Sequence, residues 1–271
     1  RSNEVHSKHR RIIKKTFPRR RIISRFPFDV FMADLVEYPQ YRFQNSNYRF
    51  ILVMIDCFTK MVWAVPMKYK TSQWTADAFE SIFKTFDKFP VHIITDRGLE
   101  FYNSQVQKLF QNYGINHYSI PTKTKWKASI VERVIRTLKS RLQRYFTKNK
   151  TKKWKDVLDQ VVANYNATPH SAHDLPPQDV NHENQKQVYS KLYPHKLLKT
   201  DCRLKIGDKV RKIIEKDLFE KGYTVNWSDE IYIIKDVRQS NGVCWYYLTT
   251  LDEEPVKGIW YYYQLNLVST H

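Results

Sequence analysis

The stretch YRFILVMIDCFTKMVWAVPMK, residues 48–68, decides the fold. Its first half is an apolar run of strand length that ends at Asp56, and a second run of this kind follows after a short polar turn. Two such runs around a polar turn predict a β-hairpin. Beyond the hairpin, apolar side chains recur at helical spacing, which predicts an α-helix over residues 71–86.

Further strands and helices alternate on both sides of this hairpin. A β-prone segment precedes it at residues 28–35, and a short apolar strand, VHIIT, follows the helix at residues 91–95. We expect the later elements to be a helix, a strand and two more helices, at residues 104–113, 117–120, 129–146 and 154–165. Elements in this order predict an α/β fold built on a mixed sheet.

The carboxy-terminal quarter of the chain has a different pattern. From residue 204 onward the apolar runs are short and strand-like, and Ser240-Asn241-Gly242 is a strong hairpin signal. Several short strands in so short a segment are typical of a small all-β barrel. We therefore expect a basic arm or linker, an α/β core, a second linker and an all-β domain, at residues 1–28, 29–177, 178–203 and 204–271.

Composition excludes several classes of protein. The chain has 271 residues, of which 42% are hydrophobic, and this is enough apolar mass for a folded core. No apolar run approaches the roughly 20 residues of a transmembrane helix. Only 6 Gly occur, without a phosphate-cradling loop, which disfavours nucleotide hydrolysis. Because Cys57, Cys202 and Cys244 are far apart and odd in number, we expect no disulfide scaffold and a reducing compartment.

The net charge of +19 is concentrated in two segments. Residues 1–28 contain ten Lys and Arg and one acid, and residues 133–155 contain ten Lys and Arg and no acid. The rest of the chain is neutral, with 26 basic and 26 acidic side chains. Two basic blocks favour a polyanionic partner such as DNA, the alternative being a solvated tail and a solvated helix face. A membrane surface fits less well, because the second block is not an isolated amphipathic anchor.

Three acidic residues stand at the ends of predicted elements. Asp34 lies in the first strand, Asp96 directly follows the strand at residues 91–95, and Glu132 lies in the first turn of the long basic helix. Each one alone is more simply a strand-end residue or a helix N-terminal carboxylate. Brought together, they would form a site of hard oxygen ligands suited to Mg²⁺ or Mn²⁺. Two such ions can activate the attacking oxygen and stabilise the leaving oxygen of a phosphodiester.

Taken together, these features resemble the catalytic core of retroviral-type DDE integrases in the RNase H-like superfamily. The resemblance is closest to integrases of gypsy-class LTR retrotransposons and of Maverick/Polinton elements. It rests on Asp34, on the hairpin at residues 48–68, and on three further motifs: TDRGLEF at residues 95–101, IVERVIRTLK at residues 130–139 and ANYNATPHSAHDLPP at residues 163–177. Asp96 and Glu132 also show the 35-residue interval of the family. The chain departs from the family at Ala128 and Ser129, where Asn-Gly is common.

The resemblance implies roles for individual residues. Asp34 and Asp96 would share one ion, and Asp34 and Glu132 would hold a second. Apart from the resemblance, we expect Glu100 to cap or to position and Asp56 to serve the hairpin turn, neither of them ligating metal. The DNA-contacting residues would be those on the face of Glu132, in the loop before it and in the basic arm, namely Arg133, Arg136, Lys139, Lys125, Trp126, Lys127, Arg19, Arg20 and Arg21.

The function implied is that of a nuclear DNA integrase. It would process the 3′ ends of a mobile-element DNA and join them to target DNA, acting as a homo-oligomer with two Mg²⁺ or Mn²⁺ ions in each site. The tail resembles the SH3-like carboxy-terminal domain of the same elements and would contact DNA or chromatin through Lys209, Arg211 and Lys212. Two alternatives stay open: a transposase or nuclease of the same fold, and a domesticated DNA-binding or chromatin-binding protein without activity.

Overall fold

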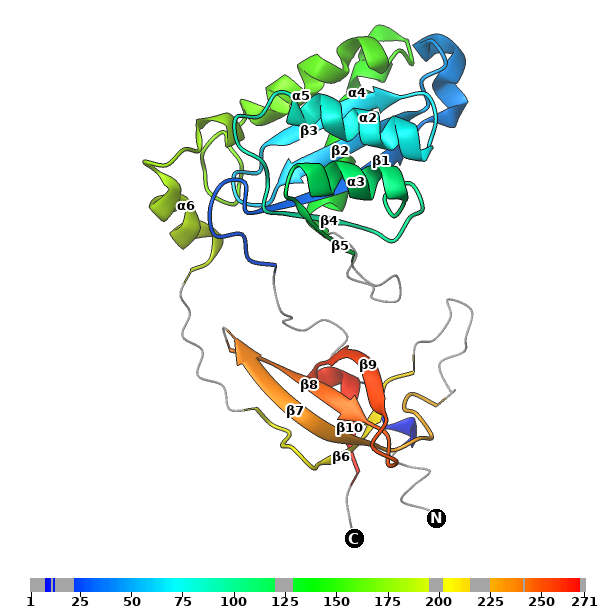
Figure 1. The fold of residues 1–271 in the computed structure, drawn as a ribbon, viewed down its shortest axis with the longest axis vertical. Helices are drawn as coiled ribbons and strands as arrows, with labels where there is room; N and C mark the ends of the chain where they lie inside the picture. Colours follow the sequence, from blue (N-terminus) through cyan, green and yellow to red (C-terminus); the bar gives the residue numbers. More distant parts are fainter. Residues whose placement is uncertain are drawn as a thin grey trace. The chain divides into compact units, whose positions relative to one another are not determined.

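The structure is a computed structural model, and it describes residues 8–10, 12, 22–119, 129–194, 202–214, 225–240 and 242–268. The chain forms two compact units (Figure 1). The first unit is Ile23–Pro194, and the second combines Arg1–Ile22 with His195–His271. In the described residues, no helix combines the length and the apolar character needed to cross a membrane.

The first unit is built on a mixed β-sheet. Among its described residues, five strands lie in the order β3-β2-β1-β4-β5. Strands β1, β2 and β3 are antiparallel, whereas β4 and β5 run parallel to β1, as the α/β class predicts. The bounds of the strands are Val30–Glu37, Phe50–Asp56, Val62–Met67, His92–Thr95 and Asn116–Ser119. The predicted hairpin is therefore β2 and β3.

Helices cover both faces of this sheet. Alternate residues of a strand point to opposite faces, and Phe31 and Ala33 of β1 belong to the core that α2 and α3 complete. Helices α4 and α5 pack on the opposite face, against β1, β2 and β3. The bounds of the helices are Ser72–Phe83 for α2, Ser104–Asn112 for α3, Ser129–Asn149 for α4, Leu158–Asn166 for α5 and Gln185–Leu192 for α6. Gly114 stands just after α3 with φ +66°, a left-handed conformation that Gly adopts readily at the end of a helix.

The second unit is all-β. In the part of it that is described, strands follow the order β10-β6-β7-β8-β9, around a core that includes Val210, Tyr232, Ile234 and Tyr246. The bounds are Lys209–Lys212 for β6, Tyr232–Ser240 for β7, Val243–Thr249 for β8, Pro255–Trp260 for β9 and Leu265–Leu267 for β10. The tight hairpin predicted at residues 240–242 joins β7 to β8. The strand expected to run to Tyr263 ends at Trp260.

A disulfide joins Cys202 to Cys244 in the second unit. This pair is not predictable from the sequence, because 42 residues separate the two Cys and the chain has an odd number of Cys. They meet because Cys202 and the β8 residue Cys244 both pack on the core of this unit. The expectation that disulfides would not support the fold is therefore corrected at this one position.

The structure also divides the basic segment that the sequence predicts to be one arm. Lys8 and Arg10 belong to the all-β unit: the Asn226 N–H donates to the Lys8 carbonyl at 3.0 Å, and the Trp227 indole N–H donates to the Arg10 carbonyl at 2.8 Å. Ser24 belongs to the α/β unit instead, since its N–H donates to the Tyr193 hydroxyl at 2.9 Å. The same α/β unit extends through α6, into the range expected to be a linker.

Candidate active site

Asp34 lies in the central strand of the sheet. It pairs with Val53 across β1 and β2, and its place in the alternation puts it on the face that α4 covers. Its side chain is half-buried, and one carboxylate oxygen accepts a hydrogen bond of 2.8 Å from the Leu35 N–H. This bond holds the carboxylate close to the backbone of its own strand.

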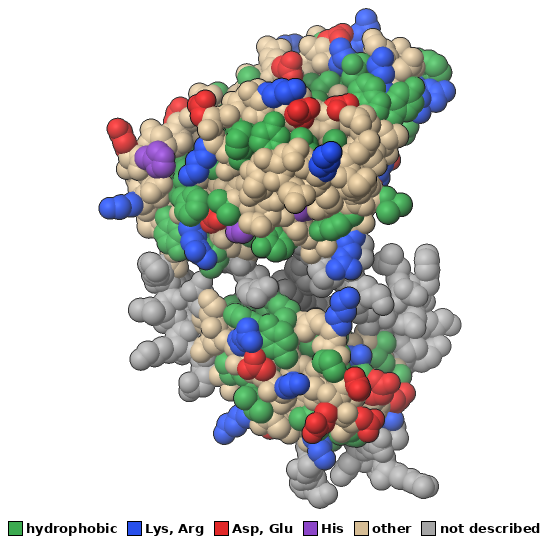
Figure 2. Space-filling view, in the orientation of Figure 1, with side chains coloured by type: hydrophobic (Ala, Val, Ile, Leu, Met, Phe, Trp, Pro, Cys, Tyr) green, Lys and Arg blue, Asp and Glu red, His purple; other side chains and the backbone are tan. Residues whose placement is uncertain are grey.

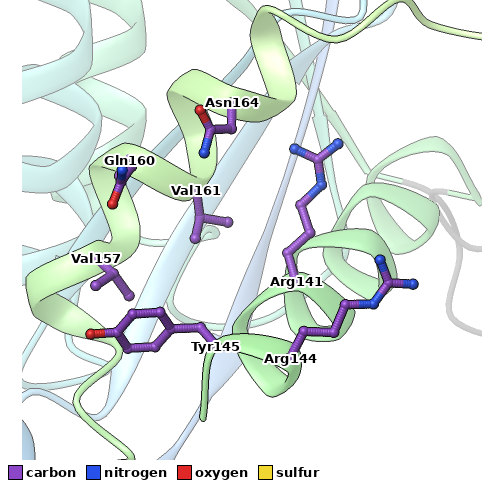
Figure 3. A pocket seen from close by; sticks show the side chains of 7 residues that line it. All are labelled: Arg141, Arg144, Tyr145, Val157, Gln160, Val161 and Asn164. Atoms are coloured by element: carbon purple, nitrogen blue, oxygen red, sulfur yellow. The ribbon is translucent and has the colours of Figure 1, made fainter. Parts of the chain in front are cut away.

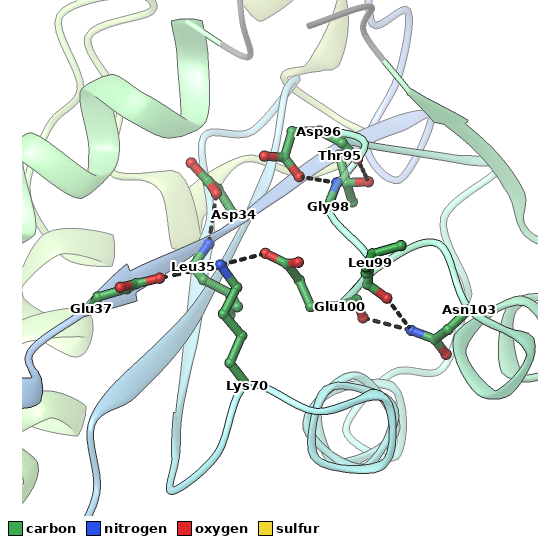
Figure 4. A network of polar contacts seen from close by, with 10 residues as sticks. All are labelled: Asp34, Leu35, Glu37, Lys70, Thr95, Asp96, Gly98, Leu99, Glu100 and Asn103. Carbon is green, nitrogen blue, oxygen red and sulfur yellow. Dashed lines mark hydrogen bonds and ion pairs between the residues drawn. The ribbon is translucent and has the colours of Figure 1, made fainter.

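Asp96 lies beside Asp34 because its strand is the parallel neighbour of β1. Met32 pairs with Ile94 in this ladder, so the residues two positions further on, Asp34 and Asp96, come out at the same end. The Gly98 N–H donates to the Asp96 carboxylate at 2.9 Å, and the Thr95 hydroxyl donates to the Asp96 carbonyl at 2.8 Å. Figure 4 shows the Asp34 and Asp96 carboxylates turned toward the same space.

Glu132 comes to the site on α4. Val131, Val134 and Leu138 of this helix are buried, which leaves Glu132 exposed in its first turn. A carboxylate is favoured there by the partial positive charge of a helix N-terminus. Glu132 therefore stands on a different element than either Asp34 or Asp96.

The pKa of Asp34 shows that these carboxylates are electrostatic neighbours. Burial, followed by repulsion from Asp96, Glu132 and Glu100, raises this pKa from 3.8 to about 6, although the Leu35 N–H opposes the shift. Raised pKa values of this kind are concentrated at functional sites. The donor set, made only of carboxylate oxygens under mutual repulsion, fits a divalent cation. Within the described ranges, however, no three acidic, His or Cys side chains stand together closely enough to hold an ion as they are.

Glu100 is tied to Lys70. The Lys70 Nζ lies 2.8 Å from Glu100 Oε1 and 3.2 Å from Glu37 Oε1, and the two acids raise the pKa of Lys70 (Figure 4). The Glu100 side chain lies directly over the Cα of Gly98, where a Cβ would collide with it. Only Gly therefore fits beneath Glu100 in this arrangement. The partners of Glu100 agree with a positioning role.

His117 packs beside the end of β4, next to the strand residue that precedes Asp96. Its Nε2 lies 2.8 Å from the Thr95 hydroxyl, its Nδ1 lies 2.6 Å from Gln107 Nε2, and its ring stacks on Tyr102 with centroids 4.4 Å apart. Burial lowers the pKa of His117 to about 4. The imidazole is therefore neutral near pH 7, and it joins the end of β4 to α3 as a structural residue.

Asp56 has the structural role that the hairpin predicts. It is fully buried and accepts hydrogen bonds from the Phe28 N–H at 3.2 Å, the Phe58 N–H at 2.8 Å and the Thr59 hydroxyl at 3.0 Å. Burial raises the pKa of Asp56 to about 6, and these bonds oppose the shift. All three donors belong to the hairpin turn or to the segment before β1, so Asp56 fixes the turn.

The predicted DNA-contacting residues of α4 lie on its exposed face. Arg133, Arg136 and Lys139 are exposed, whereas the apolar residues between them are buried. The buried apolar row of α4 ends at Phe146. The other residues predicted to contact DNA lie outside the described residues, namely Arg19, Arg20, Arg21, Lys125, Trp126 and Lys127.

The basic contact predicted for the all-β unit is partly wrong. Arg211 is buried, with 2% of its surface exposed, and its guanidinium donates to the carbonyls of Ser228 and Asp229. It is held inside the unit and does not present its charge on a DNA-facing surface. Lys209 is exposed, and the Lys212 Nζ lies 4.5 Å from the centre of the Tyr232 ring.

Sequence reasoning missed a hollow between α4 and α5. It has a volume of about 280 Å³ and is shown in Figure 3. Its lining is Arg141, Arg144, Tyr145, Val157, Gln160, Val161 and Asn164. Because none of these is acidic, the hollow is not a place for a metal ion. It explains why Tyr145 is only half-buried, since its ring lines the hollow instead of packing on the sheet.

The mixed sheet has one acidic residue in its central strand, a second after the adjacent parallel strand and a third on a covering helix. This arrangement is consistent with the RNase H-like α/β core that the sequence predicts. Residues 27–125 match the family model of the integrase core domain. This match agrees with the resemblance to integrase cores that the motifs predict. The closeness of the chain to the gypsy-class and Maverick/Polinton groups stays a prediction.

Two relatives have similar sequences. A transposon-derived protein of Caenorhabditis elegans is 34% identical over 194 residues, which are 72% of this chain and 65% of that protein. The Pol polyprotein of feline endogenous virus ECE1 is 27% identical over 135 residues, which are 49% of this chain and 13% of that protein. The chain thus spans less than two thirds of the length of either relative.

A solved structure shares the fold. An integrase in the intasome of simian T-cell lymphotropic virus, determined in complex with the PP2A regulatory subunit B56 gamma, is 18% identical with a TM-score of 0.64. The match covers 95% of this chain and 85% of that chain. The HTLV-2 integrase catalytic core domain in complex with magnesium is 21% identical with a TM-score of 0.48, covering 58% of this chain and 98% of that one.

Proposed function

We propose that the protein is a DNA integrase, a polynucleotidyl transferase that depends on Mg²⁺ or Mn²⁺. One observation carries the proposal: the pKa of Asp34 is raised to about 6, first by burial and then by the charges of Asp96, Glu132 and Glu100. Three acidic side chains from three elements of an integrase core are thereby joined in one electrostatic unit. The unit needs a cation to become stable in its ionised form.

Asp34 and Asp96 would hold one ion, and Asp34 and Glu132 the second. Bound ions of this kind stabilise the attacking and the leaving oxygens of a phosphodiester. Asp34 is ionised above pH 6 and is oriented by the Leu35 N–H, while Gly98 fixes the Asp96 carboxylate. Arg136 and Lys139 would hold the phosphates on either side of the scissile bond.

The reaction proposed has two steps. Water first attacks the phosphodiester near the 3′ end of the element DNA, and the freed 3′-hydroxyl then attacks target DNA in line, without a covalent enzyme intermediate. We further propose that the protein acts in the nucleus as a homo-oligomer on paired DNA ends. The all-β unit, which we propose to be SH3-like, would contact DNA or chromatin through exposed cations such as Lys209.

The test uses labelled terminal duplexes and a supercoiled plasmid, incubated with the protein in Mg²⁺ or Mn²⁺. Joined products are expected. Cleavage without joining would instead indicate a transposase or nuclease of the same fold. Binding without either reaction would indicate a domesticated DNA-binding protein. The Glu132→Gln protein is the negative control, because it loses one carboxylate and keeps the size and helix propensity of the side chain.

A further inference from the structure

The connection between β1 and β2 is much longer than its geometry requires. Antiparallel neighbours can be joined by two to five residues. Here residues 38–49, YPQYRFQNSNYR, join them and form the short 3₁₀ helix η1, Pro39–Asn45. This segment contains three Tyr, one Phe and two Arg, and no acid. It is the blue helical turn in Figure 1.

This connection is held rigidly to the segment that follows α4. Asn45 is buried, and its Nδ2 donates to the carbonyls of Tyr41 at 2.7 Å and Lys152 at 3.0 Å. Its Oδ1 accepts from the Lys155 N–H at 3.0 Å. The Tyr38 ring lies 6.0 Å from that of the buried Trp154. Residues 38–49 and 151–155 therefore form one surface of fixed shape.

On this surface, cations lie over aromatic rings. The Lys152 Nζ is 5.6 Å from the Tyr41 ring centre, and the Lys155 Nζ is 5.0 Å from that of Tyr48. The Arg42 guanidinium lies 4.5 Å from the ring centre of Phe43. Figure 2 shows hydrophobic and basic side chains next to each other at this end of the unit. We call Tyr41, Arg42, Phe43, Tyr48, Lys152 and Lys155 the aromatic platform.

The platform continues the predicted DNA-contacting face of α4. The Lys139 Nζ lies 6.0 Å from the ring centre of Tyr38, and the Tyr38 and Tyr41 rings are 5.7 Å apart. A chain of contacts thus leads from Lys139, two turns after Glu132, to the platform. Phe43 stands at its edge with 79% of its surface exposed, which is unusual for a large apolar side chain.

We infer that the aromatic platform is a second DNA-binding surface, which holds duplex DNA as it leaves the active site. The inference rests on the proposed function and extends it to residues beyond α4. Residues 38–49 and 146–155 carry seven cations and no acid: Arg42, Arg49, Lys148, Lys150, Lys152, Lys153 and Lys155. Phosphates release condensed counterions when they meet such a surface, and exposed rings stack on bases or sugars.

Other partners fit the platform less well. A membrane surface would need a continuous apolar stripe, but Phe43 stands alone among polar and basic neighbours. An acidic protein would pair with the cations but would not require the aromatic rings under them. Nucleic acid offers both phosphates and flat π faces, and the proposed reaction already places it on the adjoining helix face.

The test compares two triple variants by fluorescence anisotropy with a labelled duplex in EDTA, from 50 to 250 mM KCl. Arg42→Gln, Lys152→Gln and Lys155→Gln remove the platform cations. Lys84→Gln, Lys88→Gln and Lys108→Gln remove three exposed cations, two from the segment between α2 and α3 and one from α3, for the same change in net charge. Lys88 also lies over a ring, at 5.5 Å from that of Phe26.

We expect the platform variant to lose at least tenfold in affinity at 100 mM KCl. Its logarithmic salt slope should fall by about 2.7, since each phosphate contact contributes about 0.9. The control variant should bind like the wild type. An unchanged salt slope in the platform variant, or an equal loss in both variants, would overturn the inference.

A single variant, Phe43→Ala, tests the aromatic part without altering charge. Because Phe43 is exposed, the fold should be preserved, and we expect at least a threefold loss of duplex affinity with an unchanged salt slope. Wild-type affinity in this variant would contradict a stacking role.

The binding assay needs no catalysis, so it is separate from the joining assay. If the wild type joins DNA and the platform variant binds DNA as tightly as the wild type, only the inference about the platform is rejected. If the wild type binds DNA tightly, the platform variant does not, and no joining occurs, only the proposed reaction is rejected.

Discussion

Replacing Asp34 by Asn should stabilise the metal-free protein while it removes the proposed activity. Asn has nearly the same shape, and its side-chain oxygen can still accept the hydrogen bond from the Leu35 N–H. What the substitution removes is a half-buried negative charge that is repelled by Asp96, Glu132 and Glu100. Residues whose charge is needed for function often lower the free energy of unfolding of the folded protein, and we expect Asp34 to be one of them.

The magnitude follows from the pKa of Asp34. Burial first, and repulsion by the neighbouring acids next, raise it from 3.8 to about 6. A carboxyl group with a raised folded-state pKa contributes its stability below the unfolded pKa and loses that contribution as the pH rises through the folded pKa. At 1.36 kcal/mol for each pKa unit, the loss is about 3 kcal/mol at pH 7.5 and about 1.6 kcal/mol at pH 5.

The assay is urea unfolding in EDTA at these two pH values. The Asp34→Asn protein should exceed the wild type in free energy of unfolding by up to about 3 kcal/mol at pH 7.5 and by about half as much at pH 5. Glu37→Gln, three residues along β1 and exposed, is the matched control and should change stability by less than about 0.5 kcal/mol. An Asn variant less stable than the wild type at pH 7.5 would refute the electrostatic reasoning.

Three further predictions concern other residues. Glu132→Gln should abolish cleavage and joining but keep or tighten duplex binding, whereas Glu100→Gln should keep substantial joining; equal joined product from both proteins would contradict the assignment. Arg136→Glu with Lys139→Glu should abolish joining in a protein whose thermal unfolding is unchanged, because both side chains are exposed. Asn45→Ala should lower the free energy of unfolding by about 2–4 kcal/mol, since it leaves three backbone groups without partners; a loss below about 1 kcal/mol in urea unfolding would show that the connection is not anchored there.

The acidic site was predictable because it depends on short-range patterns. Strand alternation decides which face Asp34 occupies, and a parallel neighbour of β1 must end at the edge where Asp96 stands. The apolar spacing of α4 likewise leaves Glu132 exposed. Each of these inferences uses the period of one element and its order along the chain.

The anchoring of η1 and the burial of Arg211 depend on contacts between residues far apart in the sequence, which strand or helix periodicity does not predict. Asn45 meets Lys152 and Lys155 across more than 100 residues, so the rigidity of η1 is invisible in the sequence. Alternation on β6 predicts that Arg211 is exposed, since Val210 is buried. Arg211 is nevertheless buried, like Val210. The carbonyls of residues 228 and 229 accept hydrogen bonds from its guanidinium, and such partners compensate a buried charge.

The acidic and the basic side chains of the α/β unit should affect different measurable quantities, turnover and DNA affinity respectively. The carboxylates of Asp34, Asp96 and Glu132 repel phosphate, so in the absence of a cation they weaken DNA binding and cannot provide affinity. In the proposed function, the cations of α4 and of the aromatic platform would attract phosphate along the backbone without stabilising the reacting oxygens. Substitutions in the first group should therefore change turnover of bound DNA and leave affinity equal or higher. Substitutions in the second should change affinity and its salt dependence, and saturating DNA should restore the rate wherever the scissile phosphate is still placed correctly.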